Sequence, residues 1–246
     1  MNHPKLRLAA ALWFAATIGV LIATFTVIPQ LHARTGARVP LWIAAGASTV
    51  QSSLLVALAA WAGVALSKQL GLRAPAIEAA LSGGDAWAAL KPQLVAAAIV
   101  GAVVEVLLVV LARVAPAEIT KVGQAFDIPF AAKLLYGGVT EEVIMRWGLM
   151  SVFVWLPWRF IQRRNGLPRD AYVVAAIVFG GLLFGAGHLP AVAAMGVPLT
   201  ASVVTYIVFG NSLPGMLFGA LFWRKGLEAA IIAHALAHAI SVAMGV

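Results

Sequence analysis

The chain has 246 residues, of which 62% are hydrophobic and only 11% are charged. Soluble domains are roughly 45–50% apolar and about 25% charged, so this composition excludes an ordinary soluble protein and indicates an integral membrane protein. The sequence contains no cysteine, which excludes disulfides, thiol nucleophiles and thiolate metal sites and leaves carboxylates, imidazoles and hydroxyls to carry any chemistry.

Seven apolar runs are long enough to cross the roughly 30 Å hydrocarbon layer, which requires about 20 residues each. They cover residues 9–28, 41–66, 93–114, 129–157, 172–196, 201–223 and 227–245. The ten-residue alternation typical of a membrane barrel is missing, so we expect an all-α, polytopic fold of about seven transmembrane helices. The first run is too long for a signal peptide and is interpreted as a retained span.

The only long connection, residues 67–92, contains the sequence LRAPAIEAALSGG. An apolar and polar mixture of this length, followed by two glycines, predicts a short interfacial helix that ends at Gly83 and Gly84.

The net charge of +8 is unevenly distributed along the chain. If the N-terminus is cytoplasmic, eleven positive residues fall on that side: Lys5, Arg7, Lys68, Arg73, Lys91, Arg159, Arg163, Arg164, Arg169, Arg224 and Lys225. The other side receives four, which are Arg34, Arg38, Arg113 and Lys121. This is the positive-inside pattern, so the basic excess indicates topology and contact with anionic membrane lipids rather than nucleic-acid binding. In a bacterium the membrane would be the plasma (inner) membrane.

Several ionisable residues lie inside the predicted spans, where each costs several kcal/mol unless it faces a polar cavity or a partner. They are Glu105, Lys133, Glu141, Glu142, Arg146, His188, His234 and His238, with Glu228 near the edge of the last span. These residues are therefore the candidates for function.

The fourth span contains the sequence TEEVIMRW. At about 100° per residue, Arg146 shares a helix face with Glu142, four residues earlier, whereas Glu141 points elsewhere. We expect Arg146 to neutralise Glu142 and to leave Glu141 facing a cavity. The alternative is that all three residues only hold helices together.

The fifth and last spans supply imidazoles. In GGLLFGAGHLP, Phe184 and His188 lie on the same stripe as Gly181 and Gly185, a small-residue spacing that allows close helix contact. In HALAHAI, His234 and His238 lie one turn apart on one face. Two imidazoles directed at a core that holds a free acid indicate a functional constellation.

The sixth span contains Asn211, Ser212, Pro214 and Gly215, which we expect to interrupt the helix. A kink or packing seam is favoured over a catalytic Ser212. Glu105 has no partner on its own span, and either pairing with Lys133 or a place on a cavity wall remains open.

Together these residues form a pattern that resembles the CPBP family of CAAX proteases and bacteriocin-processing (Abi) enzymes, which includes the Ras-converting CAAX endopeptidases. The family pattern is EExxxR, then FxxxH, then HxxxN, on successive spans. The corresponding positions here are Glu141, Glu142, Arg146, Phe184, His188, His234 and His238. The resemblance covers residues 129–242, and its one departure is His238 in place of asparagine.

The resemblance implies a glutamate-dependent endopeptidase whose polar intramembrane cavity opens towards the cytoplasmic side. Glu141 and His188 would activate a water, and His234 and His238 would stabilise the oxyanion. Glu142, Arg146 and Phe184 would support them, without a cofactor or metal. The substrate would be a membrane-associated or lipidated peptide, with CAAX peptides among the candidates.

The whole chain, residues 1–246, is then expected to form one membrane domain. Residues 1–92 would hold two spans and the cytoplasmic interfacial loop, and residues 93–246 would form the catalytic helix core.

Four alternatives stay open. His238 makes a zinc site of Glu141, His188, His234 and His238 chemically possible, although no HExxH is present. The same fold can serve as a non-proteolytic scaffold or immunity protein. A rhomboid-like pair of Ser212 and His234 would leave the glutamates unexplained. A proton-coupled transporter finds little support without an inverted repeat.

Overall fold

The computed structural model describes residues 3–36, 38–126 and 128–245, and within these ranges the chain is helical, without strands. The helices are α1 (His3–Thr35), α2 (Leu41–Leu70), α3 (Pro75–Ser82), α4 (Ala86–Ala112), α5 (Ala117–Ala125), α6 (Phe130–Ala132), η1 (Lys133–Glu141), η2 (Val143–Met150), α7 (Ser151–Phe160), α8 (Asp170–Gly187), α9 (Leu189–Ala194), α10 (Ala201–Lys225) and α11 (Leu227–Met244).

Six stretches of the described chain are long and apolar enough to cross a membrane: Pro4–Thr35, Leu41–Leu70, Ala86–Ala112, Asp170–Ala194, Ala201–Lys225 and Leu227–Met244. The remaining predicted span, residues 129–157, is helical from α6 through η1 and η2 to α7. The prediction of an all-α, multi-pass membrane fold is therefore confirmed.

The fourth span is not the regular α-helix that the sequence analysis assumed. Lys133–Glu141 and Val143–Met150 are π-helices, in which hydrogen bonds join residues five apart rather than four. The rotation of about 100° per residue is therefore wrong for this segment. In the wider helix Gly137 lies about one turn before Glu142, so the two residues face the same neighbouring helix.

The predicted interruption of the sixth span is also wrong, because α10 runs unbroken through Pro214. Proline has no backbone N–H, so the Gly210 carbonyl loses its helical donor. The neighbouring polar side chains bond within their own helix: Asn211 Nδ2 donates to the Ile207 carbonyl (2.8 Å) and Ser212 Oγ donates to the Val208 carbonyl (2.6 Å). These bonds satisfy the two polar side chains within α10 itself.

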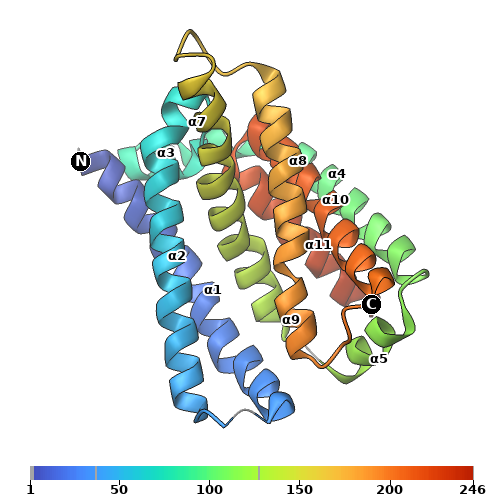
Figure 1. Ribbon diagram of the computed structural model, residues 1–246. Helices are drawn as coiled ribbons and strands as arrows, with labels where there is room; N and C mark the ends of the chain where they lie inside the picture. Colours follow the sequence, from blue (N-terminus) through green and yellow to red (C-terminus); the bar gives the residue numbers. More distant parts are fainter. Residues whose placement is uncertain (1–2, 37, 127, 246) are drawn as a thin grey trace.

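The bundle has two ends, at the top and the bottom of Figure 1. The start of α1, the end of α2, the helix α3 and the α7–α8 and α10–α11 junctions lie at the top, which we call the α3 end. The Leu227 amide donates to the Arg73 carbonyl (3.0 Å) and so joins the α10–α11 junction to this end. The α1–α2 loop, α5 and α9 lie at the bottom, which we call the α9 end.

The helix predicted in the long connection is present as α3. Pro75 occupies its first turn, and Gly83 ends it in the left-handed conformation (φ 76°), which favours glycine. Asp85 then caps α4 by accepting a hydrogen bond from the Ala88 amide (2.9 Å).

Small residues of α2 receive the largest fully buried side chain, Trp147 of η2. The indole Nε1 donates to the Ala60 carbonyl (3.3 Å), and the ring lies where a side chain on Gly63 would begin. One turn earlier in α2, Ala59 lies against Gly148 so closely that a Cβ on Gly148 would come within 2.6 Å of the Ala59 methyl. Close packing of small residues is the main source of helix association in a membrane.

We expect Gly63→Ala to destabilise the bundle because the new methyl group overlaps the Trp147 indole. Overpacking of this kind costs about 1–3 kcal/mol, more than the helix propensity that alanine gains. Thermal unfolding in detergent checks this. Gly46→Ala in the same helix is the matched control, because a Cβ there meets nothing within 4 Å. Equal midpoints for the two variants would contradict the packing described.

Candidate active site

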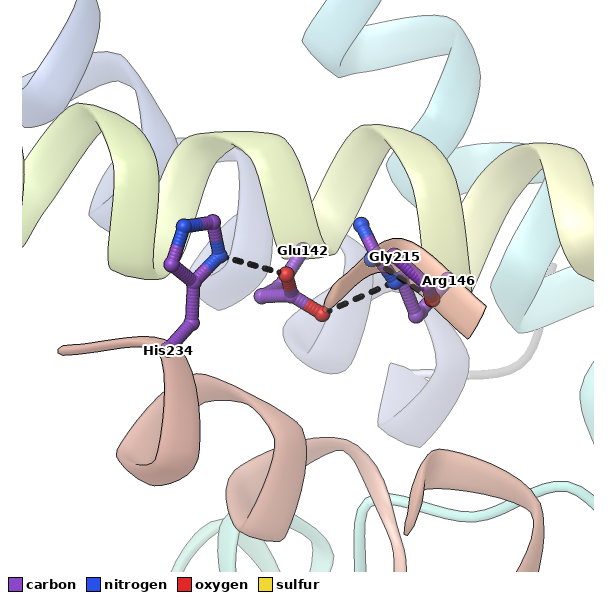
Figure 2. A network of polar contacts seen from close by, with 4 residues as sticks. All are labelled: Glu142, Arg146, Gly215 and His234. Carbon is purple, nitrogen blue, oxygen red and sulfur yellow. Dashed lines mark hydrogen bonds and ion pairs between the residues drawn. The ribbon is translucent and has the colours of Figure 1, made fainter. Parts of the chain in front are cut away.

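A completely buried carboxylate, Glu142, joins two of the sequence motifs. Its Oε2 forms an ion pair with Arg146 Nε (3.2 Å), and its Oε1 accepts a hydrogen bond from His234 Nδ1 (2.7 Å), as Figure 2 shows. The ion pair with Arg146 was predicted from the sequence, and that prediction is confirmed. The bond to His234 was not predicted.

Arg146 continues this network into α10. Its terminal Nη2 donates to the Gly215 carbonyl (2.9 Å), and its guanidinium lies over the rings of Phe184 and Phe218, at 5.0 and 5.5 Å from their centroids. A weakly hydrated guanidinium suits such an aromatic pocket, in which cation–π attraction offsets part of the lost hydration. Arg146 therefore connects the fourth span with both α8 and α10.

The orientation of His234 follows from its partners. A carboxylate accepts hydrogen bonds, so Nδ1 of His234 carries the proton that is donated to Glu142. Its ring stacks on Phe218, with centroids 4.6 Å apart and planes inclined by 18°. The ring of His238 lies 4.9 Å away. A Cβ on Gly137 would stand 2.8 Å from Nε2 of His238 and 3.6 Å from Nε2 of His234, so both Nε2 atoms approach the same point.

His188 follows the last residue of α8, where the helix gives way to α9. Its Nδ1 donates to the Phe184 carbonyl (2.8 Å), which leaves Nε2 of the neutral ring with a free lone pair. Phe184 itself meets His188 edge to face, with centroids 4.7 Å apart, and lies 6.5 Å from His234. Phe184 is thus the side chain between the imidazoles of the second and third motifs.

Glu141 differs from its neighbour in having no fixed partner. It is only partly buried and makes no hydrogen bond or ion pair with any other described residue, although the charges of Glu142 and Arg146 act on it. The predicted contrast between a paired Glu142 and an unpaired Glu141 is present. No hydrogen bond joins the Glu141 carboxylate to an imidazole of the described chain, so its predicted role with His188 stays a prediction.

Glu105 is buried in α4, and its Oε2 has no hydrogen-bond partner among the described residues. The charge of Lys133 acts on both Glu105 and His238, without an ion pair. The pairing of Glu105 with Lys133 that the sequence left open is therefore not found among the described residues, and a place on a cavity wall stays a prediction.

The zinc site considered from the sequence requires three or more ligands around one point. No three His, Asp or Glu side chains in the described ranges are grouped closely enough to hold a metal ion in this arrangement.

Ser212, the nucleophile of the rhomboid-like alternative, is fully buried. It lies against Gly185, where an added Cβ would come within 2.5 Å of the serine oxygen. Together with its bond to Val208 this contact supports the packing role predicted for Ser212.

The sequence did not indicate that three residues belong to the site: Gly137, Phe218 and Gly215, the last of which was expected only to interrupt the sixth span. Gly137 and Gly138 directly precede the TEE sequence, and this pair was the available signal that another chain approaches closely there. Phe218 and the Gly215 carbonyl had no signal of their own, because stacking and carbonyl contacts depend on how α10 is placed.

The site lies nearer the α9 end of the bundle than the α3 end. His188 stands at the α9 end of α8, and His238 lies in the half of α11 that leads away from α3. The cytoplasmic location of the N-terminus, which lies at the α3 end, and the opening of the cavity towards the cytoplasm both stay predictions.

Comparison with known proteins supports the resemblance. Residues 124–240 match the family model described as Rce1-like, type II CAAX prenyl endopeptidase. No curated protein and no solved structure was found to match. The matched segment runs from α5 into α11 and contains all three motifs. The chain is therefore a multi-pass membrane protein whose residues 124–240 are similar to the Rce1-like family of CAAX proteases.

Proposed function

We propose that the protein is an intramembrane, glutamate-dependent endopeptidase that hydrolyses a membrane-associated peptide. The observation that carries the proposal is the contrast between the two adjacent acids: Glu142 is bound on both oxygens, whereas Glu141 has no partner in the described chain. The Glu142 carboxylate, bound by Arg146 and His234, supports the structure, whereas the unbound Glu141 carboxylate can take up a proton. The family match supports CAAX-type endopeptidase activity in general.

In this mechanism Glu141 takes a proton from a water molecule as its oxygen attacks the scissile carbonyl carbon. His188 helps to hold the water through Nε2, because its Nδ1 is already committed to the Phe184 carbonyl. General-base catalysis by a positioned carboxylate contributes about 10²–10⁴-fold to the rate. When the C–N bond breaks, Glu141 returns the proton to the leaving amine.

The negative oxygen of the tetrahedral intermediate needs donors. His234 and His238 supply them in the proposal, since their Nε2 atoms approach one point beside Gly137. His234 donates from Nε2 when its ring carries both protons, and the Glu142 carboxylate balances that positive charge at Nδ1. Glu142 therefore acts as the positioning residue for His234.

The surroundings of the protein belong to the same proposal. The partners are membrane lipids and a membrane-associated or lipidated peptide, and the α3 end, which holds the N-terminus, is placed on the cytoplasmic side. If the source is bacterial, the membrane is the plasma membrane.

We expect Glu141→Gln to reduce kcat at least 100-fold while leaving the fold intact, because glutamine keeps the shape and loses the base. His188→Ala and His234→Ala should also abolish cleavage, whereas Ser212→Ala and a chelator should have little effect. The assay is cleavage of fluorogenic peptides in detergent micelles, using a farnesylated CAAX peptide and an unmodified hydrophobic peptide.

Full activity of Glu141→Gln would refute the glutamate mechanism. Inhibition by chelator would favour a metal-dependent enzyme in spite of the ligand arrangement. If the wild-type protein cuts neither peptide, the non-proteolytic scaffold becomes the better explanation.

The neighbouring substitution Glu142→Gln should act mainly on stability. It leaves the buried Arg146 without its counter-charge, and breaking a buried pair from one side costs about 3–5 kcal/mol. Thermal unfolding in detergent measures this, with Glu141→Gln as the matched control one residue away. A larger loss of stability in the control than in Glu142→Gln would reverse the roles proposed for the two acids.

Gly137→Ala tests the point at which the imidazoles meet. The new methyl group would come within 2.8 Å of Nε2 of His238, so the His238 ring must shift to admit it, whereas Nε2 of His234, at 3.6 Å, is in ordinary contact with it. We expect a fall in kcat of at least tenfold with little change in stability, because the ring of His238 lies at the end of a side chain that can rotate. Gly180→Ala, where a Cβ meets nothing within 4 Å, should keep wild-type activity. Unchanged activity of Gly137→Ala would contradict the proposed role of these imidazoles in the reaction.

A further inference from the structure

The distribution of charge distinguishes the two ends of the bundle. Of the 17 lysines and arginines, eleven lie at the α3 end and four at the α9 end, and the remaining two, Lys133 and Arg146, lie within the fourth span. Positive residues in short connections remain on the cytoplasmic side of a membrane, so the α3 end is the cytoplasmic end by this rule.

A hollow in the α3 end strengthens this assignment. The cavity has a volume of about 1050 Å³ and is lined by four cations, Lys5, Arg7, Lys68 and Arg73, and one acid, Glu78. No ion pair joins any of these cations to an acid in the part of the chain that the structure describes. This excess of positive over negative charge at a membrane surface matches the anionic lipids of a cytoplasmic leaflet.

The candidate active site lies towards the other end. Because α8 starts at the α3 end and rises 1.5 Å per residue, His188 lies about 27 Å along it. In α11, His238 lies about 16 Å from the start and about 9 Å from the end at Met244. Both Nε2 atoms that meet at Gly137 are therefore in the half of the bundle that faces α5 and α9.

Burial closes the route from the site to the α3 end. Trp147 follows Arg146 directly, is fully buried and packs on Phe222, with ring centroids 6.2 Å apart. Met150 and Val154, further towards the α3 end, are buried as well. Glu141, His188 and His238 are in contrast partly exposed. These three partly exposed side chains therefore lie on the α9 side of the buried layer that Trp147, Met150 and Val154 form.

We propose that the active site opens on the non-cytoplasmic side of the membrane. This inference rests on the proposed function for its statement about substrate: the peptide bond that is cut belongs to a segment presented at the non-cytoplasmic face, such as the translocated end of a hydrophobic peptide. A lipidated C-terminus that remains on the cytoplasmic leaflet does not reach the site in this arrangement.

The absence of cysteine from the sequence makes this testable by labelling single introduced cysteines. Gly187→Cys, beside His188, and Gly123→Cys, in α5, mark the α9 end, and a Cβ at either position meets nothing within 4 Å. The exposed Ser82→Cys marks the α3 end. The full-length variants are treated with a membrane-impermeant maleimide in right-side-out and in inverted vesicles, with the wild-type chain as the blank.

The expected result is labelling of positions 187 and 123 in right-side-out vesicles and of position 82 in inverted vesicles only. Position 187 is the decisive reading, because it reports access beside His188 itself. The opposite pattern, or equal labelling from both sides, overturns the proposal. Labelling of position 123 without position 187 in right-side-out vesicles also overturns it, because the orientation would be right and the site closed from that side.

A cleavage measurement on the same vesicles separates this inference from the proposed function. The fluorogenic hydrophobic peptide is added outside right-side-out or inverted vesicles that contain the wild-type protein. We expect at least tenfold faster cleavage in right-side-out vesicles. Faster cleavage in inverted vesicles would refute the access route and leave the peptidase in place. Labelling as expected without any cleavage would refute the peptidase and leave the orientation in place.

Discussion

The buried carboxylate of Glu142 is the constraint on which the rest of the site depends. An isolated charge inside a membrane bundle is costly, and this one is compensated by Arg146 on one oxygen and by His234 on the other. Both compensating groups are needed because the carboxylate has no exposed surface through which solvent can help. The geometry of Glu142 therefore fixes the distance between the fourth span and α11. The bond from Arg146 to the Gly215 carbonyl extends the same constraint to α10.

An aromatic shell turns this constraint into a defined orientation of the imidazoles. Phe218 stacks on His234 and also receives the Arg146 guanidinium, so one ring of α10 orients two partners of Glu142. Phe184 has the corresponding place on α8, between Arg146, His188 and His234. Replacing either ring would release several polar groups at once, because the same apolar surface supports the cation and the imidazoles. The FxxxH motif thus has a physical reason: its phenylalanine carries the ring that the arginine of the first motif requires, and its carbonyl orients the histidine.

The sequence alone predicted those features that depend on neighbouring residues in the chain. Run length and composition predicted the spans, the spacing of Glu142 and Arg146 predicted their ion pair, and the glycines after residue 82 predicted the end of α3. It did not predict the features that depend on how the helices pack against one another. The π-helical form of the fourth span is not encoded in a hydrophobic pattern, and α10 continues through Pro214, where the sequence predicted an interruption. The bond between His234 and Glu142 depends on the relative position of two spans that are 92 residues apart in sequence. The end of the bundle near which the site lies depends on the direction in which each helix runs, and the list of predicted spans does not contain those directions.

The departure of His238 from the family pattern has a physical counterpart in Gly137. An imidazole ring is longer than a carboxamide group, and in this chain the tip of the ring reaches the position that a side chain on residue 137 would occupy. The wider turn of η1 brings this glycine onto the face of Glu142, so both histidine rings and the carboxylate meet on one surface of the fourth span. An asparagine at position 238 would end short of that point and would leave room for a methyl group at position 137. Glycine at 137 and histidine at 238 are therefore a matched pair, in which the missing side chain of one makes space for the longer donor of the other.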